Sequence, residues 1–444
     1  MRVRWLGAAL AVALGVSMMA STAVAQSSSS TKPTATDVGI TATEIHVAVI
    51  ADVDNSIAPN LFKASVDAMN GWAKYINKSG GLAGRKVVVD FYDSKLNPTQ
   101  TRNAEISACQ NDVAAVGTSA VFLTSVDDMR NCKDQAGATT GLPDIPFVST
   151  AIVQQCSDQS FPIAPPQIVC STKDQHPQTY QANVTRGRYY TKTYGKTALH
   201  GAYIFTTDSK SAHDSQVASF GALQDIGIKS DGNFDVSGSA TQAAYTQIVQ
   251  AMKSKSSNFA GCGGAFTCTV NLRNEATLQG LQGVKVWDCG VQCYDTQFLS
   301  AGGSAVEGQY VDTLFLPFYD KADQKANKEL AAFVKYTGSN VASYGAYAWS
   351  AGEAFAQAVN AQVKAGGVNS VTRKTVFTQL NAIHQFDANG MLAPIDLAGR
   401  KVSKCSVTMQ VKNGKFVRVS PTKPGTFFCP ANGSIERQLD LLGS

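Results

Sequence analysis

The chain has 444 residues, of which 44% are hydrophobic and 16% are charged, and its formal net charge is +5. At about 100 to 200 residues per domain this length suits two or three domains, and the composition excludes intrinsic disorder over most of the chain. Because the charge is close to neutral for this size and the sequence contains no basic stripe, nucleic acid is not an expected partner.

Residues 1–25 are predicted to form a secretory signal peptide. Two arginines give it a positive start, residues 6–19 are mostly apolar, and small residues lead to a cleavage point after Ala25. A membrane anchor is the alternative, but these 14 residues are fewer than the roughly 20 that span a bilayer. Because no cysteine precedes residue 109, we expect no lipid anchor. The protein is therefore predicted to be exported, periplasmic or extracellular, with a flexible leader at residues 26–38.

The first part of the mature sequence alternates short apolar runs with segments of helical periodicity. Strands are predicted from the β-branched and apolar runs at residues 45–50, 86–92, 113–116 and 145–148. Helices are predicted from the spacing of apolar residues at 61–77, 98–110 and 125–136. This alternation indicates a parallel sheet that is covered by helices on both faces.

A proline-rich connection at residues 151–174 precedes a second alternating part. Helices are predicted at 178–194, 214–227, 243–253, 321–336, 343–365 and 372–383. Strands are predicted at 199–205, 233–236, 266–270, 284–287 and 310–318, and a hairpin at 406–411 and 416–419 with Asn413-Gly414 at its turn. The expected fold class is α/β, with two doubly wound Rossmann-like lobes.

Ten cysteines, an even number, lie in the mature sequence: Cys109, Cys132, Cys156, Cys170, Cys262, Cys268, Cys289, Cys293, Cys405 and Cys429. In an oxidising compartment this count favours disulfides, and sequential pairing would close loops of 3 to 23 intervening residues. Each unstrained bond would add about 2 to 4 kcal/mol of stability. A zinc site from Cys262, Cys268, Cys289 and Cys293 is the alternative, although its spacings are looser than those of short zinc knuckles. We expect disulfides and no metal.

Polar residues follow several of the predicted strands. They are Asp52 after the first strand, Thr118 and Ser119 after the third, Ser149 and Thr150 after the fourth, and Asp208 after the first strand of the second part. In doubly wound sheets, ligands bind beyond the carboxyl ends of the strands, where hydroxyls and free N–H groups at helix starts can hold a carboxylate. The alternative for each residue is a helix cap without a ligand. As a set, these loops predict a cleft for a small solute.

The sequence contains none of the usual catalytic motifs. It has no G-x-S-x-G elbow, no H-E-x-x-H helix and no phosphate-binding loop, and its five histidines lack the spacing of metal ligands. The nearest approach to a catalytic cluster is His213 with Asp208 and Asp214, for which a solvated loop histidine is the simpler interpretation. We therefore expect a binding protein rather than an enzyme, and no cofactor.

Residues 72–87 read WAKYINKSGGLAGRKV and resemble the signature of type I periplasmic solute-binding proteins. More specifically, they are similar to the branched-chain amino-acid-binding (Leu/Ile/Val-binding-like) family of ABC transporters. Weaker matches to the same family follow its order along the chain, at residues 49–52, 93–98, 115–119, 303–318, 343–354 and 386–400. The resemblance extends from about residue 39 to residue 419, which is most of the mature chain.

The resemblance implies two lobes joined by a three-strand hinge, with the ligand in the cleft between them. Lobe 1 would comprise residues 39–165 and 316–400, and lobe 2 residues 166–315 and 401–444. Members of the family hold the carboxylate of the ligand after the third and fourth strands of the first lobe. The matching residues here are Thr118, Ser119, Ala120, Ser149 and Thr150.

The chain departs from the family pattern in its second lobe. The acidic residue that meets the ligand's ammonium group has no clear match in the loop at 287–295, where Asp288 or Gln292 is the candidate. The family's aromatic loop is replaced by residues 208–213, and Tyr344 remains as a candidate aromatic wall. We therefore expect a small polar or carboxylate-bearing solute, an amino acid or a related compound, rather than leucine, isoleucine or valine.

The resemblance also implies a partner. The protein would be the substrate-binding component of an ABC transporter, expected as a monomer, that captures its small-molecule ligand and delivers it to the permease in the membrane. Two alternatives stay open at this point. One is an extracellular ligand-sensing receptor component, which a neighbouring gene for a kinase would favour, and the other is a secreted hydrolase on a similar two-lobed fold.

Overall fold

The computed structural model describes residues 1, 32–56, 58–164, 167–195 and 199–441. The predicted signal peptide lies, except for its first residue, outside the described residues. The last residues of the predicted flexible leader, 33–38, are instead held in place. Thr36 donates its hydroxyl to the carbonyl of Val371, and Asp37 Oδ2 accepts the N–H of Arg373 at 2.8 Å. They belong to the compact unit that begins at Pro33, and every element below lies in that unit.

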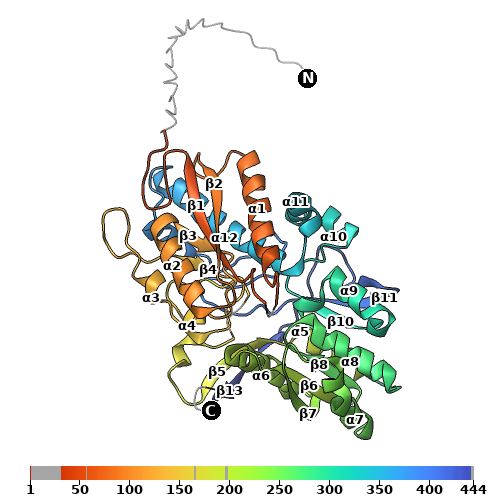
Figure 1. Cartoon of the computed structure of the whole chain (residues 1–444). Helices are drawn as coiled ribbons and strands as arrows, with labels where there is room; N and C mark the ends of the chain where they lie inside the picture. The colour runs from red at the N-terminus through yellow and green to blue at the C-terminus, as the bar shows by residue number, and fades with distance from the viewer. Residues whose placement is uncertain (2–31, 57, 165–166, 196–198, 442–444) are drawn as a thin grey trace, which may run out of the picture. The chain divides into compact units, whose positions relative to one another are not determined.

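The first sheet has the strand order β2-β1-β3-β4, and all of its strands run parallel (Figure 1). These strands are β1 (Glu44–Ala51), β2 (Lys86–Asp93), β3 (Ala114–Val116) and β4 (Asp144–Ile145). The helices that follow them are α1 (Lys63–Lys78), α2 (Pro98–Asn111), α3 (Asp127–Arg130) and α4 (Ile152–Gln155). The predicted alternation is confirmed, although the helix predicted at 125–136 is reduced to α3 because Cys132 turns back to α2 through its disulfide with Cys109.

The second sheet has the strand order β12-β11-β10-β9-β8-β6-β7. Its parallel strands are β6 (His200–Thr206), β7 (Lys229–Val236), β8 (Phe259–Cys262), β9 (Val286–Cys289) and β10 (Tyr310–Thr313). They alternate with the helices α6 (Lys210–Asp225), α7 (Thr246–Ser254), α8 (Phe266–Leu278) and α9 (Thr296–Gly302).

An antiparallel hairpin, β11 (Val407–Lys412) and β12 (Lys415–Ser420), completes one edge of the second sheet. Its turn residues Asn413 and Gly414 have φ angles of 53° and 67°. A two-residue turn of this kind requires positive φ at both positions, which asparagine and glycine adopt most readily. The predicted hairpin is therefore confirmed.

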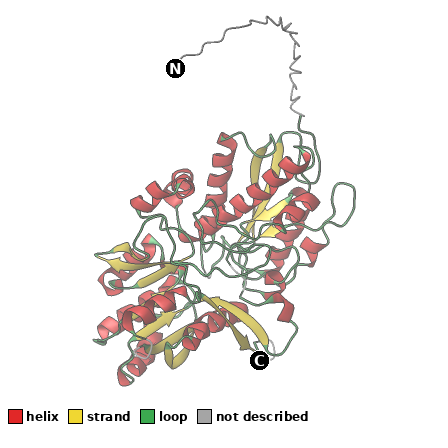
Figure 2. Cartoon of the chain, turned by 180° about the vertical axis from the view of Figure 1, so that it is seen from behind, coloured by secondary structure: helices red, strands yellow, loops and turns green. Residues whose placement is uncertain are grey.

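The chain passes between the two sheets three times. It leaves the first sheet after β4, returns to it after β10, and joins the second sheet again at β11. The returning segment forms α10 (Lys321–Ala326), α11 (Lys328–Thr337), α12 (Ser343–Gly366) and α13 (Arg373–Leu380), and α1 packs against α11 and α12. Figure 2 shows helices packed around both groups of strands. The predicted α/β fold with two lobes is confirmed.

The helix predicted at 178–194 is wrong in its first part. Residues Gln178–Asn183 form a strand, β5, that pairs antiparallel with β13 (Ser434–Leu439), and only α5 (Thr185–Tyr194) is helical. The Asn183 side chain marks the change, because its Oδ1 accepts the N–H of Thr185 at 2.8 Å. A strand whose partner lies more than 250 residues away along the chain leaves no local signal, and β13 was missed for the same reason.

The strand predicted at 266–270 is also wrong. These residues begin α8, and the strand lies at Phe259–Cys262, where alanine and glycine give little β propensity. The predicted helix at 321–336 is divided at Asn327, whose side chain accepts the N–H of Leu330 at 2.7 Å and so begins a new helix. Within the described part of the chain, no helix is both long and apolar enough to span a membrane.

All ten cysteines form disulfides between sequential partners. The pairs are Cys109–Cys132, Cys156–Cys170, Cys262–Cys268, Cys289–Cys293 and Cys405–Cys429. The zinc alternative is excluded for its four cysteines, since their sulfur atoms are bonded in pairs. No group of histidine, cysteine and acidic side chains among the described residues is arranged to hold a metal ion.

Candidate functional site

Two cavities lie among the loops that follow the parallel strands. The larger, about 700 Å³ in volume, is bounded on the first sheet's side by residues of segment 58–64, at the start of α1, and of segment 339–344, which leads into α12. On the second sheet's side it is bounded by the loops after β8 and β9, at residues 265–267 and 292–297. Loops from both sheets therefore face one space.

The smaller cavity, of about 330 Å³, lies among a different set of loops. Residues of segments 121–124, after β3, and 150–155, after β4, form one side of it. The first residues of α6, which follows β6, form the other side, and Gln167 and Tyr180 complete the wall. This cavity also lies beyond the carboxyl ends of strands from both sheets. Ligands usually bind at this position in doubly wound sheets.

Aromatic rings form part of the wall of the larger cavity. The ring of Tyr344 lies 5.3 Å from that of Phe62 and 5.4 Å from that of Phe147, and Tyr319 adds a second tyrosine to the lining. Burial raises the pKa of Tyr344 to about 12, so its hydroxyl keeps its proton at neutral pH. The predicted aromatic wall at Tyr344 therefore faces the cavity.

Asp295 brings a carboxyl group to the larger cavity. Its Oδ1 accepts the N–H of Gln297 at 2.7 Å, and burial raises its pKa above that of an ordinary aspartate. Another acidic residue of the lining, Asp67, forms an ion pair with Lys63 at 2.6 Å, whereas no cationic partner of Asp295 occurs among the described residues. Asp295 is therefore the acidic group that is available to a cationic ligand in this cavity.

Asp52 holds loops together instead of facing a cavity. The residue is fully buried, and its Oδ1 accepts the hydroxyl of Ser94 at 2.6 Å and the N–H of Leu96 at 2.8 Å. Its Oδ2 accepts the N–H of Val121 at 2.9 Å. Both carboxylate oxygens therefore accept hydrogen bonds within the protein, and these bonds connect the loops that follow β1, β2 and β3.

The loop after β3 points its predicted residues inward. Thr118 and Ser119 are fully buried, and Ala120 is part of an apolar cluster of this lobe. The hydroxyls of Thr118 and Ser119 are buried and have no hydrogen-bond partner among the described residues, and Ser119 pairs with Ala51 of β1 through the backbone. The smaller cavity is bordered by the residues that come next, Val121 to Thr124.

The loop after β4 places one of its two predicted ligand residues in the lining of a cavity. Thr150 lines the smaller cavity, and its Oγ1 accepts a hydrogen bond from the hydroxyl of Ser211 on α6 at 3.2 Å. The hydroxyl of Ser149 is buried and has no hydrogen-bond partner among the described residues. Of the predicted ligand residues, Thr150 and Tyr344 are therefore the two that line the cavities described above.

Asp208 joins the loops after β6 and β7. Its Oδ2 accepts the hydroxyl of Thr206 and the N–H of Gly238, both at 2.6 Å, and its Oδ1 accepts the hydroxyl of Ser237 at 2.9 Å. Partial burial would raise the pKa of Asp208, but these hydrogen bonds outweigh it and lower the pKa. None of these hydrogen bonds involves His213, whose Nε2 lies 3.1 Å from Asp235 Oδ1 and whose Nδ1 lies 3.6 Å from Asp214 Oδ1.

Asp288, the predicted partner of an ammonium group, lies in the interior of the second lobe. It is on β9, accepts hydrogen bonds from Arg186 at 3.1 Å and from the hydroxyl of Tyr190 at 2.8 Å, and lines neither cavity. Gln292, the other candidate, does line the larger cavity. Asp295 was missed because its position before α9 is equally that of a helix cap, a role that it also fills.

Comparisons with known proteins identify the family and the fold. The family profile described as periplasmic binding protein matches residues 44–415. Among curated protein sequences, none matches the chain. The structure resembles a leucine binding protein from Thermotoga maritima, with 15% identity and a TM-score of 0.63 over 84% of this chain and 97% of that chain.

Two further solved structures show the same likeness. A fatty acid ABC transporter substrate-binding protein from Thermomonospora curvata is 14% identical, with a TM-score of 0.64 over 89% of this chain and 95% of that chain. A branched-chain amino acid transporter substrate binding protein from Streptococcus pneumoniae, in complex with isoleucine, is 16% identical, with a TM-score of 0.63 over 84% of this chain and 98% of that chain. At these identities the likeness concerns the fold.

Proposed function

Because the chain belongs to the periplasmic binding protein family, we propose that this exported protein captures a small solute between its lobes and delivers it to the membrane permease of an ABC transporter. The observation that carries the proposal is the larger cavity of about 700 Å³, which loops from both sheets border. A ligand that contacts both sides of such a cavity stabilises the arrangement in which they approach each other. The permease would then distinguish the loaded from the empty protein.

Lobe 1 comprises residues 39–165 and 316–400 in this proposal, and lobe 2 comprises residues 166–315 and 401–444. The membership of β1 to β4 in one sheet and of β6 to β12 in another supports this division. The packing of α1 against α11 and α12 supports the assignment of the returning segment to lobe 1. The three crossings of the chain between the sheets would form the hinge.

The solute in this proposal is an amino acid or a related compound whose ammonium group meets Asp295. A partly buried carboxylate without a cationic partner is unfavourable, and a bound cation reduces that cost. Asp295 has this character in the larger cavity, where it is close enough to Tyr344 to contribute to the raised pKa of the tyrosine. An aromatic face beside the carboxylate is a second favourable contact for an ammonium group.

Thermal and urea unfolding with a panel of amino acids tests the proposal. A ligand present at 100 times its dissociation constant should raise the free energy of unfolding by about 2.7 kcal/mol. The Asp295→Asn variant should lose this stabilisation, while Asp54→Asn should keep it, because the Asp54 side chain is 84% exposed and lies outside the lining of the larger cavity. Absence of stabilisation by every amino acid and amide of the panel at millimolar concentration would contradict the proposal. Equal binding by the Asp295→Asn variant would contradict the role of that residue.

A further inference from the structure

The longest helix of the described chain begins at the larger cavity. This helix, α12, has 24 residues, and Ala342, Ser343 and Tyr344 at its start line the cavity. The peptide dipoles of a helix leave a partial positive charge at its N-terminus, where the first N–H groups have no partner within the helix. The start of α12 therefore brings a positive end to a space that loops of both sheets border.

The first N–H groups of α12 have no acceptor in the protein. The residue at the N-cap position is Ala342, which has no side-chain oxygen, and the first turn contains no acidic residue. The N–H groups of Ser343, Tyr344 and Gly345 donate to no acceptor among the described residues. Alanine is an unfavourable N-cap because it leaves these donors to water or to a ligand.

Ser343 adds a hydroxyl to these N–H groups. The residue is only 3% exposed and lines the larger cavity, and its hydroxyl has no hydrogen-bond partner among the described residues. A buried hydroxyl without a partner costs free energy, which a ligand group that accepts its proton would recover. A carboxylate can accept hydrogen bonds from a hydroxyl and from N–H groups at the same time. The first turn of α12 therefore has the donors that a carboxylate requires.

The charges of the lining also favour an anion at the start of α12. Lys63 is the only cationic side chain among the lining residues, and it is paired with Asp67 at 2.6 Å. Asp295 lies on the second sheet's side of the cavity, close enough to Tyr344 to raise the pKa of the tyrosine. The cavity thus presents a helix N-terminus and a carboxylate to the same ligand. This pattern is complementary to the two charges of an amino acid.

The loops after β3 and β4 supply no donors to this cavity. The hydroxyls of Thr118, Ser119 and Ser149 are buried, and none of these residues lines either cavity. Thr150 lines only the smaller cavity. A carboxylate in the larger cavity therefore needs donors from another part of the first lobe, and the start of α12 provides them.

We propose that the first turn of α12 is the carboxylate-binding subsite of the larger cavity. The carboxylate accepts the hydroxyl of Ser343 and the free N–H groups of this turn, while the ammonium group of the same ligand meets Asp295. The inference rests on the proposed capture of a solute in this cavity, and it narrows the solute to amino acids that keep a free carboxylate. Amides and simple amines would lack half of the contacts.

Isothermal titration of the full chain with three probes tests this subsite. L-phenylalanine carries both charges, 3-phenylpropionate carries only the carboxylate, and 2-phenylethylamine carries only the ammonium group. Their ring suits a lining that contains Phe266, Tyr319 and Tyr344. We expect L-phenylalanine to bind most tightly, and the other two at least about tenfold more weakly.

Two outcomes of the titration would overturn the proposal. Equal affinity for L-phenylalanine and 2-phenylethylamine would refute the carboxylate subsite alone, because the contact with Asp295 would remain. No binding of any of the three probes at millimolar concentration would overturn both the subsite and the proposed capture of an amino acid in this cavity.

Two variants test the assigned contacts. Ser343→Ala removes the hydroxyl, and in Ala342→Asp the new side chain accepts the N–H groups itself. Each should weaken the binding of L-phenylalanine and 3-phenylpropionate about tenfold without weakening that of 2-phenylethylamine. Ser350→Ala is the matched control, because Ser350 lies on the same helix, donates to the carbonyl of Ala346 at 2.8 Å and is not part of the lining.

Asp295→Asn should show the opposite pattern. It should weaken the binding of L-phenylalanine and 2-phenylethylamine and leave that of 3-phenylpropionate at least as tight, since a negative charge is removed. Loss of the effect in Asp295→Asn alone would refute the role of Asp295 and leave the subsite in place. If Ser343→Ala fails to fold, Ala342→Asp decides, since Ala342 is only half-buried. Unchanged affinity of the folded variants for L-phenylalanine would refute the subsite.

Discussion

Replacement of Glu105 by glutamine should make the stability of the protein less dependent on pH. Glu105 lies on α2, is only 2% exposed, and has an Oε1 without a hydrogen-bond partner among the described residues. Burial, together with the negative charges of Asp144 and Asp128, raises the pKa of Glu105 to about 8. The folded protein therefore holds a proton at neutral pH that the unfolded chain, with a glutamate pKa near 4.5, releases.

The direction of the effect follows from this difference. The stability that Glu105 contributes is fully present below pH 4.5 and is lost as the pH rises through 8. Between pH 5 and pH 8, the loss amounts to about 3 kcal/mol of unfolding free energy for these two pKa values. Glutamine has nearly the same shape and no proton to release, so Glu105→Gln should lose about 3 kcal/mol less than the unaltered protein over this interval.

Urea unfolding at pH 5, 6.5 and 8, followed by tryptophan fluorescence and circular dichroism, measures this difference. Glu436→Gln is the matched control, because Glu436 is exposed on β13 and its replacement should leave the pH dependence unchanged. Asp112 and Asp312, whose pKa values are raised by burial to about 8 and about 7, keep a residual dependence of the same sign. Equal losses of stability for the unaltered protein and Glu105→Gln would refute the reasoning.

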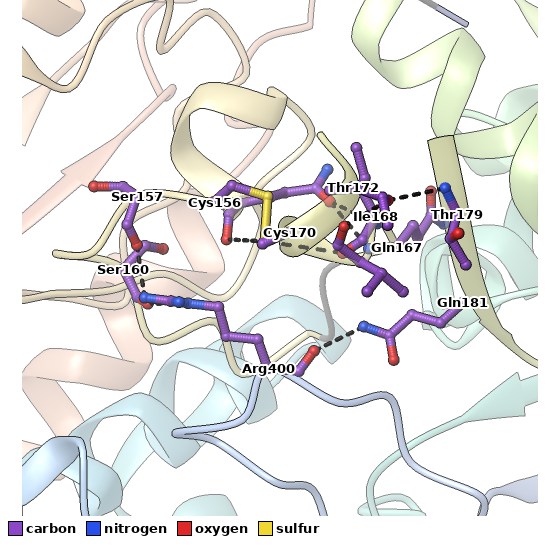
Figure 3. The surroundings of a disulfide bond; sticks show 12 residues. Cys156, Ser157, Ser160, Gln167, Ile168, Cys170, Thr172, Thr179, Gln181 and Arg400 are labelled. Atoms are coloured by element: carbon purple, nitrogen blue, oxygen red, sulfur yellow. Dashed lines mark hydrogen bonds between the residues drawn. A yellow bond between two sulfur atoms is a disulfide. The ribbon is translucent and has the colours of Figure 1, made fainter. Parts of the chain in front are cut away.

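Three further predictions concern a disulfide, a buried aspartate and the larger cavity. A Cys156→Ser/Cys170→Ser double variant should lose about 3 kcal/mol of unfolding free energy, because the disulfide joins two residues that are 14 positions apart in the chain (Figure 3). Urea unfolding measures this loss, and an unchanged free energy of unfolding would contradict the prediction. Asp52→Asn should lower the free energy of unfolding by about 2 kcal/mol, because an amide cannot accept all three hydrogen bonds as strongly as a carboxylate. Titration calorimetry should show unchanged amino-acid affinity for this variant. A selective loss of binding would place Asp52 in the ligand site. Because burial raises the pKa of Asp295, amino-acid binding should weaken on acidification at a higher pH than for an ordinary aspartate, and the Asp295→Asn variant should lack this weakening; the same pH dependence in both proteins would exclude this carboxylate as the partner.

The fold could be predicted where the structure depends on local pattern. The strands β1, β2 and β6 and the long helix α12 lie close to the residues that periodicity assigned to them, because burial against one face repeats along the segment. The predictions failed where a distant partner decides the conformation. β5 is a strand because β13 pairs with it, and α8 is a helix although its first residues include β-branched threonine and valine.

The site could be predicted at the level of loops but not of single side chains. Loops after β1, β4 and β9 do border the cavities, as strand topology requires. However, Asp52, in the loop after β1, and Asp288, on β9, turn inward to satisfy N–H groups, an arginine and hydroxyls of their own lobes. Sequence does not state whether an acidic side chain faces a cavity or a neighbouring donor, because both positions lie within a few residues of the same strand end.

A crystal structure of the protein, purified without denaturation and soaked with the amino acid that stabilises it most, tests solute capture most directly. We expect electron density for one amino acid in the larger cavity, with its ammonium group at hydrogen-bond distance from Asp295 and contacts to segments 58–64 and 265–267. Density for water alone in this cavity, at a ligand concentration that stabilises the protein in solution, would contradict the proposed site.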